Sequence, residues 1–154
     1  MQLNLDGRHA LVCGASQGIG RASAIELALL GADVTLLARR AETLENLAAE
    51  LPRTHAGQRH DFVAVDVGDT AALRARAEAL VAHAPVHILV NNSGGPPPGS
   101  VLDAAPEDFL AAWQQHLLAN HTLAQAVVPG MRAAGWGRIV NVISTSVREP
   151  IPGM

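Results

Sequence analysis

Three glycines near the N-terminus have a spacing that suits the binding of a phosphate group. Gly14, Gly18 and Gly20 form the pattern Gly-x-x-x-Gly-x-Gly between an apolar run and a helical stretch. Such a turn lets a pyrophosphate approach the N-terminus of the helix, where free N–H groups and the helix dipole favour negative charge. Glycine-rich turns are common, and it is the order strand, glycines, helix that favours a dinucleotide site here. Further candidate contacts in this loop are Ser16, Gln17 and Ile19.

The charge at the end of the second apolar run indicates which nicotinamide dinucleotide this site would take. About twenty residues beyond the glycines, an NAD site places a carboxylate that accepts hydrogen bonds from the ribose. Here the run ends in Ala38, Arg39 and Arg40, with no acid. Guanidinium groups match a 2′-phosphate in charge and in geometry, so we expect NADP(H), with Arg39 as the primary contact. Arg40 is either a second contact or part of the solvated first turn of the next helix, and the Ser16 hydroxyl could bind the same phosphate.

The elements that must position these residues alternate between short apolar runs and longer helical stretches. Continuous apolar runs of this kind are typical of strands in a parallel sheet that helices cover on both faces. The expected strands are 9–13, 33–38, 62–65, 87–91 and 138–143, and the expected helices are 19–30, 41–51, 70–82, 106–113 and 115–132. Gly31 is placed to end a helix, and Asp69 is placed to cap the next one. We infer an α/β fold with a Rossmann-type doubly wound parallel sheet.

Four motifs, in order and over essentially the whole chain, resemble those of the short-chain dehydrogenase/reductase (SDR) family. The glycine loop resembles the family's Thr-Gly-x-x-x-Gly-Ile-Gly, with Cys13 in place of the threonine. The others are Val65-Asp66-Val67, which resembles the aspartate that holds adenine, Asn91-Asn92-Ser93-Gly94, which resembles Asn-Asn-Ala-Gly, and Gly137 to Ser144, which resembles the fifth strand and the catalytic serine. The resemblance is nearest to the 3-oxoacyl-carrier-protein-reductase-like branch. It implies that Asp66, Val67, Asn92, Ser93 and Gly94 contact the cofactor.

The resemblance also implies an active site that this chain carries only in part. In the family a serine polarises the substrate carbonyl, a tyrosine exchanges the proton, and a lysine lowers the pKa of that tyrosine. Ser144 matches the serine, and the tyrosine should follow roughly thirteen residues later. The chain ends at Met154 and contains no tyrosine and no lysine, since all eleven basic residues are arginine. We therefore interpret residues 1–154 as an NADP(H)-binding domain truncated before the Tyr-x-x-x-Lys segment, with an incomplete sheet and no activity alone.

The family's fourth catalytic residue, an asparagine on the long helix, has no direct match. Counting back from Pro129-Gly130-Met131, a landmark of the family, its place falls on His116. Asn120 lies one helical turn further on, so the two side chains are expected on one face. Either His116 takes the proton-relay role, because imidazole both donates and accepts, or Asn120 reaches in from the next turn, or both are ordinary polar residues of the helix.

Composition narrows the class of protein and its partners. Apolar residues make up 49% of the 154 and charged residues 16%, which excludes a disordered or fibrous chain. A net charge of −3 without a basic run argues against nucleic-acid and membrane-surface binding, and no stretch is long enough to span a bilayer. The single cysteine and the absence of a signal sequence favour the cytoplasm. The histidines show no metal-ligand spacing.

Two functions remain open from the sequence. The first is an NADP(H)-dependent oxidoreductase that acts on a small-molecule carbonyl or alcohol. The second is a dinucleotide-binding sensor or scaffold without chemistry, which the irregular His116 favours slightly. The long helix is apolar on more than one side, with Leu117, Leu118, Val127 and Val128 among its residues. We therefore expect further burial against a partner subunit or the rest of the protein, and a homotetramer for the complete protein.

Overall fold

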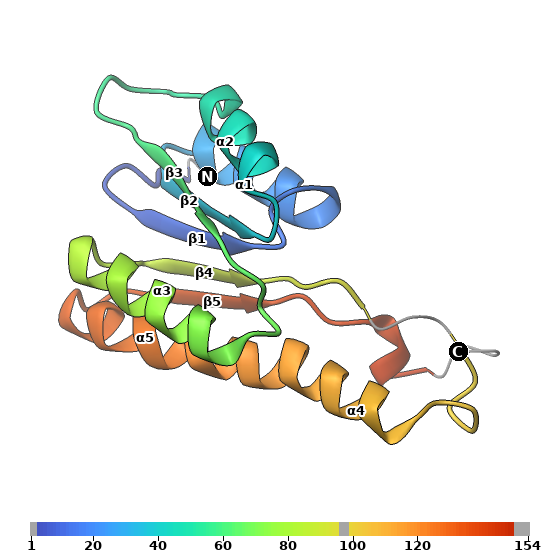
Figure 1. Cartoon of the computed structure of the whole chain (residues 1–154). Helices are drawn as coiled ribbons and strands as arrows, with labels where there is room; N and C mark the ends of the chain where they lie inside the picture. The colour runs from blue at the N-terminus through green and yellow to red at the C-terminus, as the bar shows by residue number, and fades with distance from the viewer. Residues whose placement is uncertain (1–2, 96–98, 150–154) are drawn as a thin grey trace.

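The chain forms one parallel five-stranded sheet with helices on both faces (Figure 1). The computed structural model describes residues 3–95 and 99–149. The strands lie in the order β3-β2-β1-β4-β5, and every neighbouring pair is parallel. They are β1 (His9–Cys13), β2 (Asp33–Ala38), β3 (His60–Ala64), β4 (Ile88–Asn91) and β5 (Arg138–Asn141). The expected doubly wound Rossmann-type sheet is confirmed.

The helices follow the strands in strict alternation until the last connection. They are α1 (Gly18–Leu29), α2 (Ala41–Glu50), α3 (Thr70–His83), α4 (Pro106–Trp113) and α5 (Ala119–Ala133). Asp69 caps α3 as expected, because its Oδ1 accepts a hydrogen bond from the Ala72 N–H at 2.9 Å. Gly31 follows the end of α1 with φ +96°, a conformation that suits glycine. Within the described residues, no helix is long and apolar enough to cross a membrane.

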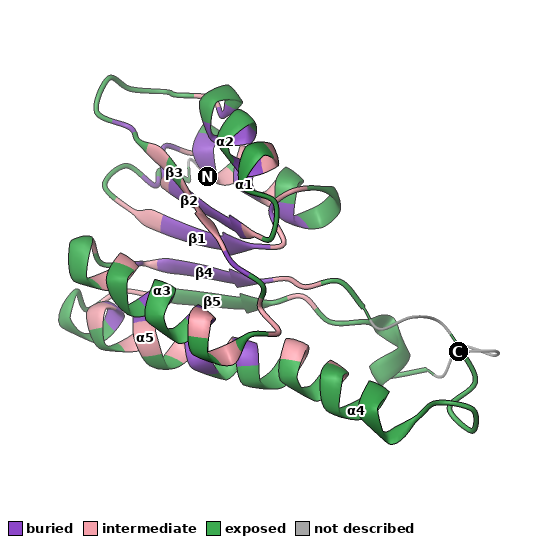
Figure 2. Ribbon diagram, in the orientation of Figure 1, coloured by how far each residue is buried: buried purple, intermediate pink, exposed green. Residues whose placement is uncertain are grey.

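Two apolar layers cover the two faces of the sheet, and the most buried strands lie at its centre (Figure 2). On one face α1 and α2 pack against alternate strand residues, among them Val12, Val34 and Leu36. On the other face α3 and α5 cover the intervening residues, among them Leu11, Leu37 and Leu89. Residues of a strand alternate between its faces, so strands buried on both sides read as continuous apolar runs. This layering explains why the runs were recognisable in the sequence.

The long expected helix 115–132 is interrupted. A π-helical turn, η1 (Gln114–Leu118), joins α4 to α5, so the three form one continuous helical path (Figure 1). A π turn bonds residue i to i+5 and thereby changes which side chains share a face. His116 lies in this π turn, so the i, i+4 spacing that was expected to place His116 and Asn120 on one helix face does not hold as in a regular α-helix. Four strand bounds also differ by one or two residues. β3 is His60–Ala64 rather than 62–65, β4 begins at Ile88 rather than at His87, and β5 ends at Asn141 rather than at Ile143.

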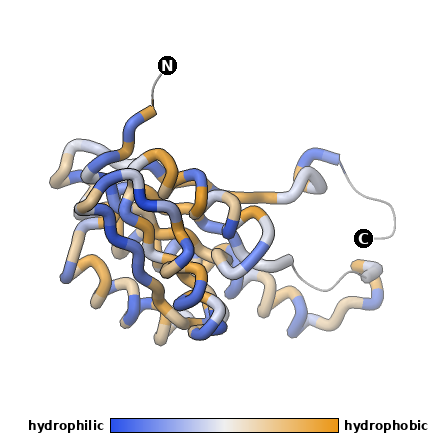
Figure 3. Tube along the Cα trace, turned by 90° about the horizontal axis from the view of Figure 1, so that it is seen from above, coloured by the Kyte–Doolittle hydropathy of each residue, from blue (hydrophilic) through white to orange (hydrophobic). Residues whose placement is uncertain are grey.

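The edge strand β5 is open on its outer side. All four of its residues are exposed, including Ile139 at 40% and Val140 at 49%. The first turns of α4 and the 3-10 turn η2 (Thr145–Val147) project beyond the carboxyl edge of the sheet (Figures 1 and 3). Apolar side chains on this projection are exposed, Leu110 at 67% and Trp113 at 57%. The open edge agrees with the expected incomplete sheet. Val127, one of the apolar residues for which we expected further burial against another part of the protein or a partner, is already only 1% exposed and packs in the α3 layer.

Candidate nucleotide-binding groove and active-site residues

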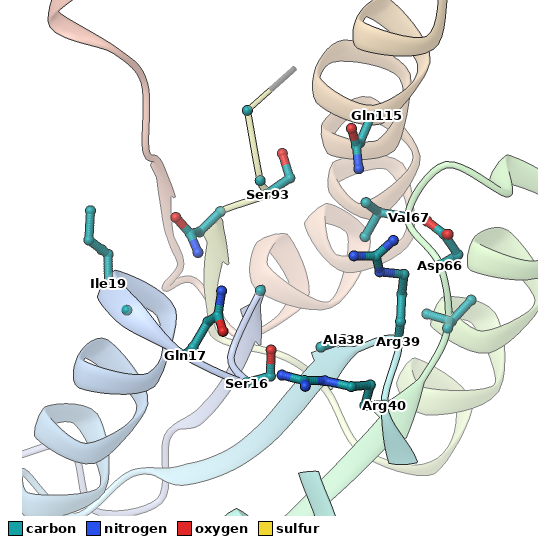
Figure 4. Close-up of a pocket in the computed structure, with 16 residues that line it drawn as sticks. Ser16, Gln17, Ile19, Ala38, Arg39, Arg40, Asp66, Val67, Ser93 and Gln115 are labelled. Carbon is teal, nitrogen blue, oxygen red and sulfur yellow. The ribbon is translucent and has the colours of Figure 1, made fainter. Parts of the chain in front are cut away.

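A groove of about 850 Å³ opens at the carboxyl ends of the strands (Figure 4). It lies where the strand order reverses, because the chain moves outward from β1 to β3 on one side and continues with β4 on the other. Crevices at this reversal are where open α/β sheets bind ligands. The groove is lined by Gly14, Ser16, Gln17, Gly18, Ile19, Ala38, Arg39, Arg40, Val65, Asp66, Val67, Asn92, Ser93, Gly94, Gly95 and Gln115. Every residue predicted to bind the cofactor is among them except Gly20.

The three positions of the first loop are glycine for different physical reasons. A Cβ on Gly20 would collide with the carbonyl oxygen of Gly14, and a Cβ on Gly14 would meet the backbone and side chain of Asn92. Gly18 has φ +56° and no atom within 4 Å of the place a Cβ would occupy, so it faces open space. Close packing therefore requires glycine at positions 14 and 20. Gly18 instead leaves room for a ligand at the start of α1. These contacts fit a pyrophosphate, which needs a close approach to this helix end.

The first N–H groups of α1 are not capped by the side chain of the residue that precedes the helix. Its N-cap residue Gln17 makes no side-chain capping hydrogen bond. The first four N–H groups of a helix have no intrahelical partner, and an anion is one way to satisfy them. The loop therefore offers donors and a positive dipole end directly at the groove.

Asparagines tie the floor of the groove together. The Asn92 Nδ2 donates to the carbonyl oxygen of Cys13 at 3.4 Å, which holds the end of β4 against the glycine loop. Asn91 Nδ2 donates to Asn141 Oδ1 at 2.8 Å across the β4–β5 pair. Burial raises the pKa of the Cys13 thiol to about 12, so this cysteine is a neutral packing residue below the loop. The substitution of cysteine for the family's threonine is thus accommodated without a reactive group.

A basic corner closes one end of the groove (Figure 4). Arg39 and Arg40 follow β2 directly and are both exposed, and the Arg40 guanidinium points toward Ser16 while Arg39 extends toward Val67. Across the described residues neither arginine forms an ion pair with a carboxylate. Asp66 lies just beyond β3, the strand beside β2, and its Oδ1 accepts a hydrogen bond from the Gly68 N–H at 2.9 Å. The corner therefore presents two guanidiniums and one hydroxyl, without an acid at the end of β2.

The predicted catalytic residues occupy two separate places. Ser144 lies after β5, where its Oγ accepts hydrogen bonds from the Ser146 N–H at 3.1 Å and the Ser146 hydroxyl at 2.7 Å. His116 lies in η1, where its Nδ1 is 2.7 Å from Ser93 Oγ. Among the described residues, no hydrogen bond joins Ser144 to His116 or to Asn120. Asn120 is half-buried at the start of α5.

Two features of the site were not predicted from the sequence. Gln115 lines the groove beside Ser93, and the Ser93–His116 hydrogen bond joins the groove wall to the helical path. Gln115 and His116 both belong to the π turn, for which no sequence signal was recognised. The departures from the family motif at positions 93 and 116 were the available signal, because they fall on the two residues that contact each other.

Comparison with known proteins places the chain in a family. The sequence pattern of the short chain dehydrogenase family matches residues 8–154. An L-xylulose reductase of Mesocricetus auratus is 37% identical over 98% of this chain and 59% of its own length. Among solved structures, L-sorbose reductase from Gluconobacter frateurii, complexed with NADPH and L-sorbose, has a TM-score of 0.91 at 34% identity, covering 99% of this chain and 58% of that one.

A third relative lies in the branch that the sequence motifs resembled. It is a 3-oxoacyl (acyl-carrier-protein) reductase from Agrobacterium tumefaciens with NADP bound, with a TM-score of 0.89 at 29% identity, covering 99% of this chain and 58% of that one. The chain thus spans between half and two thirds of the length of these relatives. The match over residues 8–154, the collinear motifs and the groove at the sheet's reversal point together establish that the chain belongs to the short-chain dehydrogenase family.

Proposed function

We propose that residues 1–154 are the NADP(H)-binding domain of an oxidoreductase that reduces a carbonyl group or oxidises an alcohol. The observation that carries this proposal is the glycine loop. Gly18 leaves open space at the uncapped start of α1, and the groove continues from there to Arg39 and Arg40. Solved relatives carry NADPH or NADP, in agreement with the choice of cofactor that the arginines predict.

The residues of this chain would hold the cofactor by charge and by shape. The N–H groups of the loop and of the α1 N-terminus would bind the pyrophosphate, and Arg39, with Arg40 and Ser16, would bind the 2′-phosphate. Asp66 and Val67 would contact the adenine, and Asn92, Ser93 and Gly94 would line the path toward the nicotinamide. A bound NADP(H) supplies or accepts the hydride. The groove walls would orient it.

The acid–base chemistry requires residues outside this chain. We propose that Ser144 donates its hydroxyl hydrogen to the substrate carbonyl. Its hydrogen bonds with Ser146 leave that hydrogen free, because Ser144 Oγ is the acceptor in both. The family's tyrosine and lysine have no counterpart among the 154 residues, so the proposal places them in a further part of the protein. His116, or alternatively Asn120, would take the proton-relay place of the family's asparagine.

The substrate class follows from the relatives rather than from the groove. Those relatives include sugar reductases and a 3-oxoacyl-carrier-protein reductase, so we propose a small-molecule carbonyl or alcohol. We also propose a homotetramer for the complete protein, because Leu117 is 47% exposed and Leu118 38% exposed on the outer side of the helical path. Sedimentation at micromolar concentration tests this, and a full-length monomer would contradict it.

A binding experiment and a turnover experiment on the full-length protein separate the two candidate functions. Binding is followed by quenching of tryptophan fluorescence with NADPH, and turnover by loss of NADPH absorbance with a panel of ketoses, diketones and 3-oxoacyl thioesters. The enzyme proposal predicts both binding and turnover. Tight binding with no turnover on any carbonyl would favour the dinucleotide-binding sensor, and absence of binding would contradict both.

A further inference from the structure

Two departures from the family's motifs contact one another at the wall of the groove. Ser93 stands where the family has alanine, and His116 stands where it has asparagine. The structure brings Ser93 Oγ within 2.7 Å of His116 Nδ1, across 23 positions of sequence. Alanine has no hydrogen-bonding atom in its side chain, so the family's own residue would leave this imidazole nitrogen without that partner. The serine and the histidine therefore form a matched pair.

The backbone on both sides fixes this contact. Ser93 follows β4 by two residues and lines the groove, while His116 lies at the centre of the π turn η1. The Ala119 N–H donates to the Gln114 carbonyl oxygen, the i to i+5 bond of that turn. Single π turns inside helices are uncommon and occur frequently at functional sites. Gln115 lines the same groove as Ser93 (Figure 4), and the next residue, His116, contacts the Ser93 hydroxyl.

The second ring nitrogen restricts the tautomer. His116 Nε2 is buried and has no hydrogen-bond partner among the described residues. A neutral imidazole carries one N–H, so the unpartnered nitrogen is either a donor or an acceptor. Buried N–H groups without a partner are rarer than buried acceptors without one. The arrangement in which Nδ1–H donates to Ser93 Oγ leaves Nε2 as an acceptor and is the favoured one.

We propose that Ser93 is the positioning residue of His116, holding its ring in the Nδ1–H tautomer so that Nε2 is a buried proton acceptor. The Ser93 O–H then remains free to donate into the groove. When a proton reaches Nε2, an N–H bond forms there, the Nδ1–H bond breaks toward Ser93 Oγ, and the serine's original proton passes to water in the groove. The reverse sequence carries a proton inward. The use of this path in turnover rests on the proposed oxidoreductase function, whereas the tautomer does not.

Nitrogen NMR of the full-length protein tests the tautomer directly. With ¹⁵N-labelled histidine, the ring signals of His116 are assigned by their loss in His116→Gln, a step that is needed because residues 1–154 alone contain seven histidines. At a pH where the ring is neutral, we expect a pyrrole-type shift at Nδ1 and a pyridine-type shift at Nε2. Ser93→Ala should move the two shifts toward each other, and Ser93→Thr, which keeps the hydroxyl, should restore them.

Ser23→Ala, a serine-to-alanine change in α1, is the matched control and should leave both shifts unchanged. A pyridine-type shift at Nδ1 in the unsubstituted protein would overturn the proposal. So would shifts that do not respond to Ser93→Ala, or that respond equally to Ser23→Ala.

Kinetics of the same variants test the proton path. Losing one hydrogen bond in the path should lower kcat about five- to tenfold in Ser93→Ala, with little change in the KM for NADPH and with recovery in Ser93→Thr. A raised KM with unchanged kcat would make Ser93 a cofactor contact only and would contradict the path. Absence of turnover in the unsubstituted protein would refute the proposed oxidoreductase function while leaving the tautomer result to stand or fall by itself.

Discussion

Replacing Arg39 by alanine should separate the two nicotinamide cofactors. NADPH differs from NADH by the 2′-phosphate, and Arg39 is placed at the end of β2, where the ribose-reading residue of this fold lies. The substitution removes a guanidinium that has no carboxylate partner among the described residues, so no buried charge is left behind. We therefore expect a loss of affinity for NADPH without a loss of folding stability.

The magnitude follows from one charge-assisted hydrogen bond. Such a bond contributes about 1.5–3 kcal/mol, which corresponds to roughly a ten- to hundredfold change in Kd. Arg39 is exposed, and salt screens interactions of exposed charges, so the effect should lie toward the lower figure and should shrink as ionic strength rises. The Kd for NADH should change little, because NADH has no phosphate at that position.

Fluorescence titration of the full-length protein with both cofactors, at low and at high salt, gives the four Kd values needed for each variant. Arg40→Ala, measured in parallel, decides whether the guanidinium that points toward Ser16 is a second contact (Figure 4). Arg53→Ala is the matched control, because Arg53 is exposed and lies outside the residues that line the groove. An equal loss for NADPH and NADH in Arg39→Ala would refute the assignment of Arg39 to the 2′-phosphate.

Three further predictions concern packing, pH and activity. Gly20→Ala should destabilise the fold by about 1–3 kcal/mol in urea denaturation, because its Cβ would collide with the Gly14 carbonyl oxygen; an unchanged unfolding midpoint would contradict the close packing of the loop. Burial lowers the pKa of His9, whose Nε2 is hydrogen-bonded to Thr35 Oγ1 at 2.8 Å, so the unfolded chain binds this proton more readily. Stability should therefore fall as pH drops below the ordinary value of 6.5, and His9→Gln should flatten that part of the pH profile; an identical profile would show that His9 is not the titrating group. The purified 154-residue chain should show no NADPH-dependent reductase activity, since it contains no tyrosine and no lysine; turnover free of host reductases would contradict the catalytic roles.

The sheet and the groove could be predicted because their signals are local in the sequence. Each central strand is buried on both faces and so appears as an uninterrupted apolar run, as in Leu11–Val12 and Leu36–Leu37. The glycine loop could be recognised because its spacing is a local pattern, in which a Cβ on Gly20 would collide with the Gly14 carbonyl oxygen only six residues earlier. The order of these elements then fixed the carboxyl edge at which the predicted cofactor-binding residues gather.

The helical wall could not be predicted because its geometry depends on contacts between distant residues. The π turn at Gln114–Leu118 has no periodicity that separates it from an α-helix, so His116 and Asn120 were expected on one face. Leu117 and Val127 are both apolar and look equivalent in the sequence, yet Val127 is buried against the α3 layer and Leu117 is 47% exposed. Which apolar residue finds cover is decided by tertiary packing.

Hydride transfer itself is the central claim, and isotopic labelling measures it most directly. NADPH carrying deuterium at the transferable position of the nicotinamide would be incubated with the full-length protein and an accepted carbonyl substrate, and the alcohol product analysed by mass spectrometry. The account predicts deuterium on the former carbonyl carbon, and loss of that product when Gly18, the residue facing open space at the start of α1, is replaced by a bulky valine. NADPH bound in the groove with no deuterium in any product would contradict it.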